Sequence, residues 1–172
     1  MEFYNLVIMS NLQKPSLEQT ISKYLKRHRL TLSIAESITG GMLSDRITNI
    51  PGSSNYFMMS VVAYSNEAKI NLLKVPKDII KKHGAASKET AKFMAKGMRK
   101  KANTDISLSI TGIAGPSGGT VEKPVGLVYI GLASADKKTL VKEYHFKGSR
   151  IEIKKKATNN ALKLLSDFFR GL

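Results

Sequence analysis

Two glycine-rich segments carry residue types that could do chemistry. Residues 35–41 read Ala-Glu-Ser-Ile-Thr-Gly-Gly, and residues 111–120 read Thr-Gly-Ile-Ala-Gly-Pro-Ser-Gly-Gly-Thr. Each segment follows an apolar, strand-like run. Glycine lets backbone N–H groups approach a ligand closely, and a helix that opens after such a turn adds the positive end of its dipole. The two segments therefore predict a pocket for an anionic ligand, with Ser37 beside it as a potential nucleophile.

A serine nucleophile needs a base, because a free hydroxyl is a weak nucleophile at neutral pH. Histidine is the usual base. His28, however, lies at a basic helix end, His83 at a helix terminus before glycine, and His145 in a strand. We expect all three histidines to be structural. The alternative base is a lysine whose pKa is lowered.

Lys69 is the lysine that this hypothesis singles out. In residues 64–69, Tyr-Ser-Asn-Glu-Ala-Lys, either Ser65 or Asn66 is expected to cap a helix, which places Lys69 in the first turn. The helix dipole and partial burial both disfavour the ammonium form there and lower its pKa. Tyr64 could pass a proton between Lys69 and Ser37. Spacing alone leaves this set open, because most lysines of so basic a chain are solvated.

Apolar periodicity predicts the elements that position these residues. Capping-box pairs, Ser16 with Gln19 and Ser149 with Glu152, precede two of the expected helices. The other helices are expected over residues 66–73, 77–82 and 91–102. Strand-like runs cover residues 31–35, 56–64, 105–111, 125–133 and 139–146.

Strands that alternate with helices indicate an α/β fold. We expect a single-domain three-layer sandwich with a mixed, mostly parallel sheet flanked by helices, because the last two runs form a hairpin through residues 134–138. One domain is expected over residues 1–172, with residues 1–15 as an N-terminal leader segment. Ligands of open α/β sheets bind beyond the carboxyl ends of strands. Both glycine-rich segments and Tyr64 follow such ends, so three segments are expected to meet at one site.

Composition excludes several classes of protein. The 172 residues are 42% hydrophobic, which argues against a disordered chain, and the absence of cysteine excludes disulfides, thiolate metal sites and a cysteine nucleophile. No secretory signal and no apolar run of about 20 residues is present, so we expect a cytoplasmic protein without a membrane partner. No histidine or carboxylate cluster has metal-ligand spacing. We expect neither a metal nor a cofactor.

The formal net charge of +15 comes mostly from lysine. Short basic runs lie at residues 81–82, 99–101, 137–138 and 154–156, on predicted helix faces and turns. Nucleic-acid-binding proteins usually pair such charge with aromatic stacking platforms or arginine-rich elements. This chain has no tryptophan, so we expect a solvated basic surface and no specific nucleic-acid partner. The positive potential could still attract an anionic substrate.

Six motifs in this order resemble the CinA C-terminal domain family, which includes the nicotinamide mononucleotide deamidases (PncC). The resemblance runs from about Leu17 to Leu172. Ile38 stands where cysteine or leucine is common, and 172 residues leave no room for the N-terminal domain that many members carry. The matching motifs are residues 35–41, 51–54, 64–69, 84–87, 111–116 and 122–126.

The resemblance implies an amidohydrolase that converts nicotinamide mononucleotide to nicotinic acid mononucleotide and ammonia, a step of NAD salvage in the pyridine nucleotide cycle. It also implies that Ser37 is the nucleophile and that Tyr64 and Lys69 assist it. With the resemblance we expect a homo-oligomer with this mononucleotide as its small-molecule partner.

Substrate-binding residues are expected in both glycine-rich segments. Backbone N–H groups around Ser37–Gly41 are expected to stabilise the oxyanion. The segment 111–120, with Lys123 nearby, is the first candidate for the ribose phosphate, and Arg150 at the start of the last helix is the second. Surface solvation of both cations, and a purely turn-forming role of the glycines, remain open. The expected set is Thr39, Gly40, Gly41, Thr111, Gly112, Ala114, Gly115, Gly119, Thr120, Lys123 and Arg150.

Two other functions compete with this one. A non-catalytic nucleotide-binding or interaction module would keep the pocket without the reaction, and the intact Ser37, Tyr64 and Lys69 argue against it. A basic nucleic-acid-binding protein that acts in DNA uptake or competence is suggested by the net charge and by the family's competence-related name. The missing aromatic platform argues against that second alternative.

Overall fold

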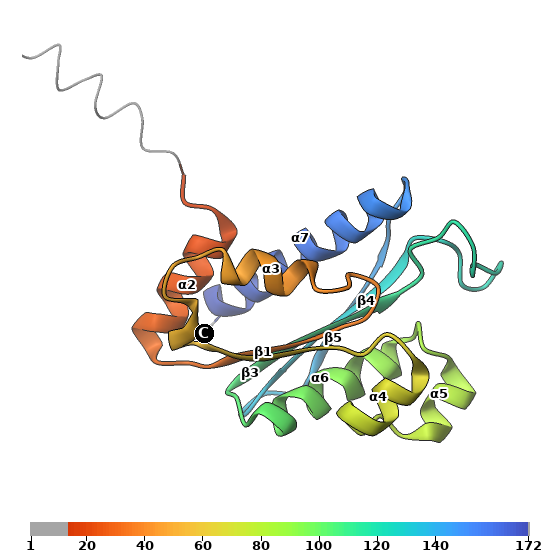
Figure 1. The fold of residues 1–172 in the computed structure, drawn as a ribbon, viewed down its shortest axis with the longest axis horizontal. Helices are drawn as coiled ribbons and strands as arrows, with labels where there is room; N and C mark the ends of the chain where they lie inside the picture. The colour runs from red at the N-terminus through yellow and green to blue at the C-terminus, as the bar shows by residue number, and fades with distance from the viewer. Residues whose placement is uncertain (1–13, 172) are drawn as a thin grey trace, which may run out of the picture.

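The computed structural model describes residues 14–171 and is built around one five-stranded sheet (Figure 1). Most of the predicted leader segment, residues 1–13, lies outside the described residues. The strands are β1 (Leu32–Glu36), β2 (Phe57–Val62), β3 (Ile106–Gly112), β4 (Leu127–Ser134) and β5 (Leu140–His145). The helices are α2 (Leu17–His28), α3 (Met42–Thr48), α4 (Asn66–Leu73), α5 (Lys77–His83), α6 (Lys88–Ala102) and α7 (Arg150–Arg170), with a 3₁₀ turn η1 (Ser53–Asn55).

The sheet order is β2-β1-β3-β4-β5. β1 pairs in parallel with both β2 and β3, whereas the pairs β3–β4 and β4–β5 are antiparallel. The predicted mixed sheet and its late hairpin are therefore confirmed, and β4 alone runs against the other four strands. Because β2, β1 and β3 are parallel neighbours, their carboxyl ends emerge together at one end of the sheet.

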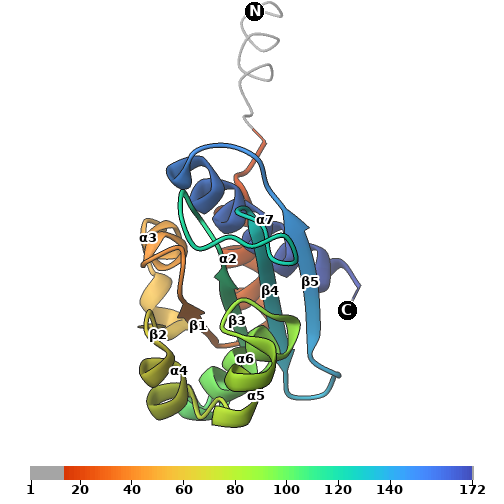
Figure 2. The same cartoon turned by 90° about the vertical axis from the view of Figure 1, so that its right-hand side faces the viewer.

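Helices cover both faces of the sheet, which confirms the three-layer sandwich. α2, α3 and α7 lie on one face, and α4, α5 and α6 lie on the other (Figures 1 and 2). The predicted caps are present: Ser16 with Gln19 and Ser149 with Glu152 form capping boxes, and Ser65 accepts from the N–H of Ala68. No helix in residues 14–171 is long and apolar enough to cross a membrane.

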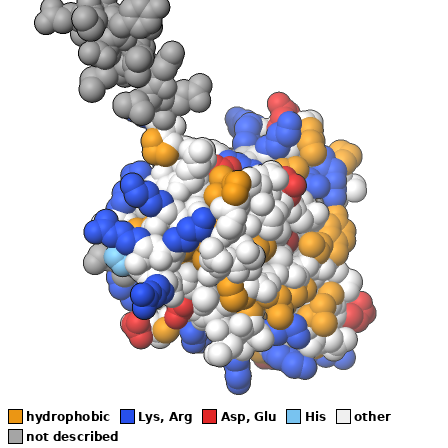
Figure 3. All heavy atoms as spheres, turned by 60° about the vertical axis from the view of Figure 1, so that its left-hand side comes forward, with side chains coloured by type: hydrophobic (Ala, Val, Ile, Leu, Met, Phe, Trp, Pro, Cys, Tyr) orange, Lys and Arg blue, Asp and Glu red, His pale blue; other side chains and the backbone are white. Residues whose placement is uncertain are grey.

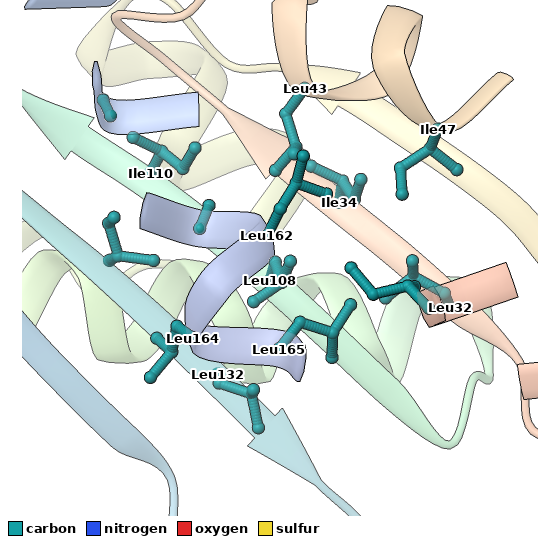
Figure 4. Close-up of a cluster of buried hydrophobic side chains, with 14 of the residues drawn as sticks. Leu32, Ile34, Leu43, Ile47, Leu108, Ile110, Leu132, Leu162, Leu164 and Leu165 are labelled. Carbon is teal, nitrogen blue, oxygen red and sulfur yellow. The ribbon is translucent and has the colours of Figure 1, made fainter. Parts of the chain in front are cut away.

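The larger hydrophobic core lies between the sheet and the helices α2, α3 and α7. Alternate residues of β1 and β3, such as Leu32, Ile34 and Leu108, point to this face and are fully buried. Figure 4 shows these strand residues packed against side chains of α3 and α7, among them Leu43, Ile47, Leu162 and Leu165.

Small polar residues on the opposite face let α6 approach the sheet closely. Ser107 Oγ donates to the carbonyl of Ala95 at 2.6 Å, and Ser109 Oγ donates to the carbonyl of Ala91 at 2.7 Å. Both serines are fully buried, so these hydrogen bonds offset the cost of removing two hydroxyls from water. The close contact seats α6 against the middle of the sheet.

Two features differ from the sequence-based expectation. A helix does open after the first glycine-rich segment, namely α3, but the second segment leads directly to strand β4 and adds no helix dipole. The second difference is that periodicity did not predict α3. This short helix buries only Leu43 and Ile47, which are too few apolar positions for a periodic signal.

Candidate active site

Ser37 lies directly beyond the carboxyl end of β1 and is 6% exposed. The chain then turns through Gly40 and Gly41, whose φ angles of 62° and 99° lie in the left-handed region that suits glycine. Gly41 is the N-cap residue of α3. Ser37 is thus held between the middle of a buried sheet and the start of a helix.

Glu36 stabilises this turn through hydrogen bonds, a role that was not predicted from the sequence. Its buried carboxylate accepts hydrogen bonds from the N–H groups of Gly41, Leu43 and Ser44, at 3.0, 3.2 and 2.9 Å. It also accepts from Ser44 Oγ. A carboxylate at this position satisfies the unpaired N–H groups at the start of α3. The sequence signal for this role is a glutamate directly before Ser37, followed by the glycine pair at the start of α3.

Lys69 reaches Ser37 from the first turn of α4. Its Nζ lies 3.1 Å from Ser37 Oγ, and it donates to the carbonyl oxygens of Ala63 and Tyr64 at 2.9 and 3.2 Å. The side chain is 1% exposed. Burial lowers the pKa of Lys69 from 10.5 to about 8. In the neutral amine, two hydrogens can stay on the carbonyls while the lone pair faces the Ser37 hydroxyl.

Tyr64 follows β2, as expected, and among the described residues no hydrogen bond joins its phenol to Ser37 or Lys69. Its hydroxyl accepts a 2.6 Å hydrogen bond from Arg150 Nη2, and the ring is 58% exposed. The contact with Lys69 is made by the backbone carbonyl of Tyr64. The Tyr64 phenol therefore lies at the rim of the site, beside Arg150.

Arg150 connects two of the three converging segments. Besides Tyr64, its guanidinium reaches the carbonyl of Gly115 through Nη1 at 2.7 Å. Ser149 and Glu152 fix the start of α7 next to it. The β1–α3, β2–α4 and β3–β4 segments and the start of α7 thus gather at one end of the sheet, on the right of Figure 1. The expected meeting of three segments is seen.

Lys123 lies elsewhere. Its ammonium donates to the carbonyl of His83, the last residue of α5. Arg150 approaches the β3–β4 segment from α7, whereas Lys123 binds the end of α5, and these two helices lie on opposite faces of the sheet (Figure 2). Lys123 also closes a turn with Thr120, whose hydroxyl accepts from the Lys123 N–H at 3.0 Å. The C-terminal end of a helix explains this lysine without a ligand.

The β3–β4 segment uses several expected binding residues for its own structure. The Thr111 hydroxyl donates to the carbonyl of Ala85 at 2.8 Å, and Ala114 is buried. A Cβ at Gly119 would lie 2.8 Å from the N atom of Val125, and one at Gly115 would lie 2.5 Å from Val125 Cγ1. These glycines, and Gly112 against β4, allow close packing within the loop.

Two further groups lie beside the Ser37 turn. The hydroxyl of Thr39 is buried and has no hydrogen-bond partner among the described residues. Lys154, one helical turn after Arg150, brings its Nζ to within 3.7 Å of where a Cβ of Gly40 would lie. Lys154 belongs to the basic run 154–156, and its spacing of four from Arg150 places both side chains on one face of α7.

Among the described residues, no histidine side chain forms a hydrogen bond with Ser37. His28 stacks on Tyr24, His83 lies 3.6 Å from a Glu89 carboxylate oxygen, and His145 lies 2.8 Å from Glu143. In residues 14–171 no group of three or more histidine, aspartate or glutamate side chains is placed to hold a metal ion. A buried serine with a buried lysine is an arrangement capable of acyl transfer, with the amine as base.

Comparison with known proteins agrees with this architecture. The model of the CinA C-terminal domain matches residues 14–169. A CinA-like protein from Dictyoglomus thermophilum is 52% identical over 157 residues, which are 91% of this chain and 37% of that protein. A protein from Halothermothrix orenii, named as competence-damage inducible, is 56% identical over 135 residues, 78% of this chain and 33% of that protein. The chain spans about a third of the length of these relatives.

Solved structures extend the comparison to the fold. The competence/damage inducible protein CihA from Agrobacterium tumefaciens superposes with a TM-score of 0.83 at 33% identity, covering 90% of this chain and 96% of that one. A CinA superfamily protein from Klebsiella pneumoniae gives a TM-score of 0.86 at 27% identity, covering 91% and 97%. This chain belongs to the CinA C-terminal domain family.

Proposed function

We propose that this domain hydrolyses the carboxamide of nicotinamide mononucleotide to nicotinic acid mononucleotide and ammonia. The observation that carries the proposal is the 3.1 Å contact between Ser37 Oγ and Lys69 Nζ, with both groups buried. The substrate is inferred from the resemblance to the deamidases of the family. The cationic Arg150 and Lys154 at the rim support a phosphate-bearing substrate.

The reaction begins with the neutral form of Lys69. Ser37 Oγ attacks the carboxamide carbon while the Lys69 amine takes its proton, and the carbonyl oxygen becomes an oxyanion. Gly40 and Gly41 already donate their N–H groups to the Ser37 carbonyl and to Glu36. We therefore place oxyanion stabilisation on the N–H groups of Ile38 and Thr39 and on the Thr39 hydroxyl. One such donor is typically worth about 3 kcal/mol of barrier.

The second half of the reaction reverses these roles. The Lys69 ammonium protonates the amide nitrogen, the C–N bond breaks, and ammonia leaves a nicotinoyl ester on Ser37. Water then attacks the ester, Lys69 accepts a proton from that water, and the Ser37–acyl bond breaks with return of the proton to Oγ. No separate acid is required, because one lysine carries the proton in both steps.

The test is ammonia release from nicotinamide mononucleotide, with nicotinic acid mononucleotide identified as the second product. Ser37→Ala should lower kcat by at least about a thousandfold, because the attacking atom is gone. Ser54→Ala, at an exposed serine on η1, is the matched control and should leave the rate unchanged. Activity of Ser37→Ala within about tenfold of the wild type would remove Ser37 from the nucleophile role.

Absence of turnover by the wild-type chain would contradict the proposed reaction. In that case binding of nicotinamide mononucleotide, measured by calorimetry, would favour the non-catalytic nucleotide-binding module. The absence of both turnover and binding would exclude this mononucleotide as the ligand.

A further inference from the structure

A basic hollow lies at the end of the sheet opposite the candidate active site. It has a volume of about 630 Å³ and is formed by α6 from Lys92 onward and by the turn between β4 and β5. Figure 3 turns the left-hand end of Figure 1 toward the viewer and shows Lys and Arg side chains, with some Asp and Glu, on that part of the surface. The hollow is lined by Lys92, Lys96, Arg99, Lys100, Asn103, Ala133, Ser134, Ala135, Lys137, Lys138 and Thr139.

Six of the lining residues are cations, and none is a carboxylate. None of the six forms an ion pair with a described residue. Asp105 and Asp136 line an adjoining hollow, which shares Ser134, Ala135 and Lys137 with this one. The Asp105 carboxylate is already occupied by the N–H and hydroxyl of Thr31, each at 2.7 Å. The positive charge of the hollow is therefore not neutralised from within the described residues.

The arrangement of these cations is not explained by folding. Lys92, Lys96 and Lys100 follow one another at intervals of four on α6, which places like charges about 6 Å apart along the helix axis. Such like-charge pairs destabilise a helix. Only the cations of the last turn gain from the helix dipole, and Arg99 also donates to the carbonyl of Thr104.

The polar groups in the walls favour an anion with hydrogen-bond acceptors. Asn103 contributes an amide and Thr139 a hydroxyl. The hydroxyl of Ser134 is buried and has no partner among the described residues. No aromatic side chain lines the hollow, so nucleic-acid bases have no stacking platform there. The groups present recognise phosphate oxygens rather than bases.

We propose that this hollow is a binding site for a small oligophosphate, an anion with two or more linked phosphate groups. Its volume lies within the usual range for small-ligand sites, about 300–1,000 Å³. Cations on two walls, one a helix and the other a hairpin turn, surround a compact anion better than an extended strand. The site lies apart from Ser37 and Lys69 and does not depend on the proposed reaction.

Titration calorimetry of the full chain with inorganic tripolyphosphate tests the proposal. We expect one tripolyphosphate per chain, with orthophosphate and sulfate binding more weakly because they carry fewer charges. A triple variant, Lys96→Gln with Lys100→Gln and Lys138→Gln, should lose at least about tenfold in affinity. Lys137 is left in place because its ammonium lies over the Phe168 ring.

A matched control removes the same charge elsewhere. Lys23, Lys81 and Lys163 are exposed and lie outside the hollow, so their joint replacement by Gln should change affinity by less than about twofold. Circular dichroism checks the fold of both variants. A single reversal, Lys96→Glu, provides a second variant that should also weaken binding.

Three results would overturn the proposal. The first is no saturable binding of tripolyphosphate by the wild type. The second is an equal loss of affinity in the triple variant and in its control, which would show an effect of net charge only. The third is binding of an oligothymidylate at lower concentration than tripolyphosphate with the same dependence on the triple variant, which would assign the surface to a nucleic-acid backbone.

Discussion

Arg150 Nη2 donates a 2.6 Å hydrogen bond to the hydroxyl of Tyr64, although 86 positions separate the two residues. The same guanidinium holds the carbonyl of Gly115. One exposed cation therefore links the end of β2, the β3–β4 segment and the start of α7. This contact places the Tyr64 phenol at the rim of the site, whereas within residues 14–171 the hydrogen-bond partner of the Ser37 hydroxyl is Lys69.

Tyr64→Phe is expected to affect binding more than chemistry. Because Lys69 contacts Ser37 directly, kcat should fall by less than about tenfold, while KM should rise as Arg150 loses its hydroxyl partner. Steady-state kinetics with nicotinamide mononucleotide separates the two constants. Tyr129→Phe, on β4, serves as the control. A loss of kcat as large as that of Ser37→Ala would instead assign proton transfer to the Tyr64 hydroxyl.

Arg150→Ala and Lys123→Ala should differ, because Arg150 starts α7, whereas Lys123 binds the end of α5 on the opposite face of the sheet. Loss of a charge-assisted hydrogen bond should lower kcat/KM of Arg150→Ala for the mononucleotide by about 10- to 100-fold. Lys123→Ala should stay within about threefold of the wild type, since its ammonium is bound to the carbonyl of His83.

Nicotinamide riboside shows whether Arg150 acts through the phosphate. The wild type should prefer the mononucleotide to the riboside, and Arg150→Ala should lose most of that preference, because the riboside lacks the phosphate that we propose the guanidinium binds. Equal losses on both substrates would assign Arg150 to loop structure. A greater effect of Lys123→Ala than of Arg150→Ala would return the phosphate to the α5 side.

Activity should rise with pH through an apparent pKa of about 8. Burial lowers the pKa of Lys69 from 10.5 to about 8, and only the neutral amine can accept the Ser37 proton. kcat/KM should therefore increase about tenfold per pH unit well below 8 and level off above it. The range from pH 6 to pH 9 extends from about two units below to about one unit above the pKa of Lys69. A kcat/KM that stays constant over this range would contradict Lys69 as the base.

Lys69→Arg complements the pH profile. A guanidinium stays protonated throughout this range and cannot act as a base, so the variant should be inactive. Lys163→Arg, at an exposed position of α7, is the matched control and should keep full activity. An active Lys69→Arg enzyme would exclude general-base catalysis by this residue.

Glu36→Gln should disturb the turn that holds Ser37. Its carboxylate accepts from three N–H groups and one hydroxyl, and the amide of glutamine turns one acceptor atom into a donor. We expect the free energy of unfolding to fall by about 2–4 kcal/mol. kcat should fall with little change in KM, because Glu36 positions Ser37 rather than the substrate. Urea denaturation and steady-state kinetics measure the two effects, with the exposed Glu67→Gln as control.

The outcome for Glu36→Gln separates two roles. A decrease in stability without any decrease in kcat would show that the carboxylate only caps α3. A decrease in kcat that persists at low temperature, where the variant is fully folded, would show that the turn must be held for Ser37 to react.

Local signals in the sequence determined most of the elements, α3 excepted, and the starts of three helices. The capping boxes at Ser16 and Ser149 and the cap at Ser65 start α2, α7 and α4 at the predicted positions. Such caps depend on residues three or four positions apart, so the sequence shows them directly. The alternation of strands with helices likewise predicted the three-layer sandwich. It also predicted that Ser37 and Tyr64 lie at the same end of the sheet, beyond the carboxyl ends of their strands.

The tertiary structure alone decided how the residues of the site meet. The burial of Lys69, the contact of Arg150 with Tyr64 and the capping of α5 by Lys123 join positions far apart in the chain. Desolvation, which lowers the pKa of Lys69, depends on every group packed around it and leaves no mark in the neighbouring sequence. The spacing of residues could nominate a serine and a lysine, but only packing brings Lys69 Nζ to Ser37 Oγ and excludes water from the pair.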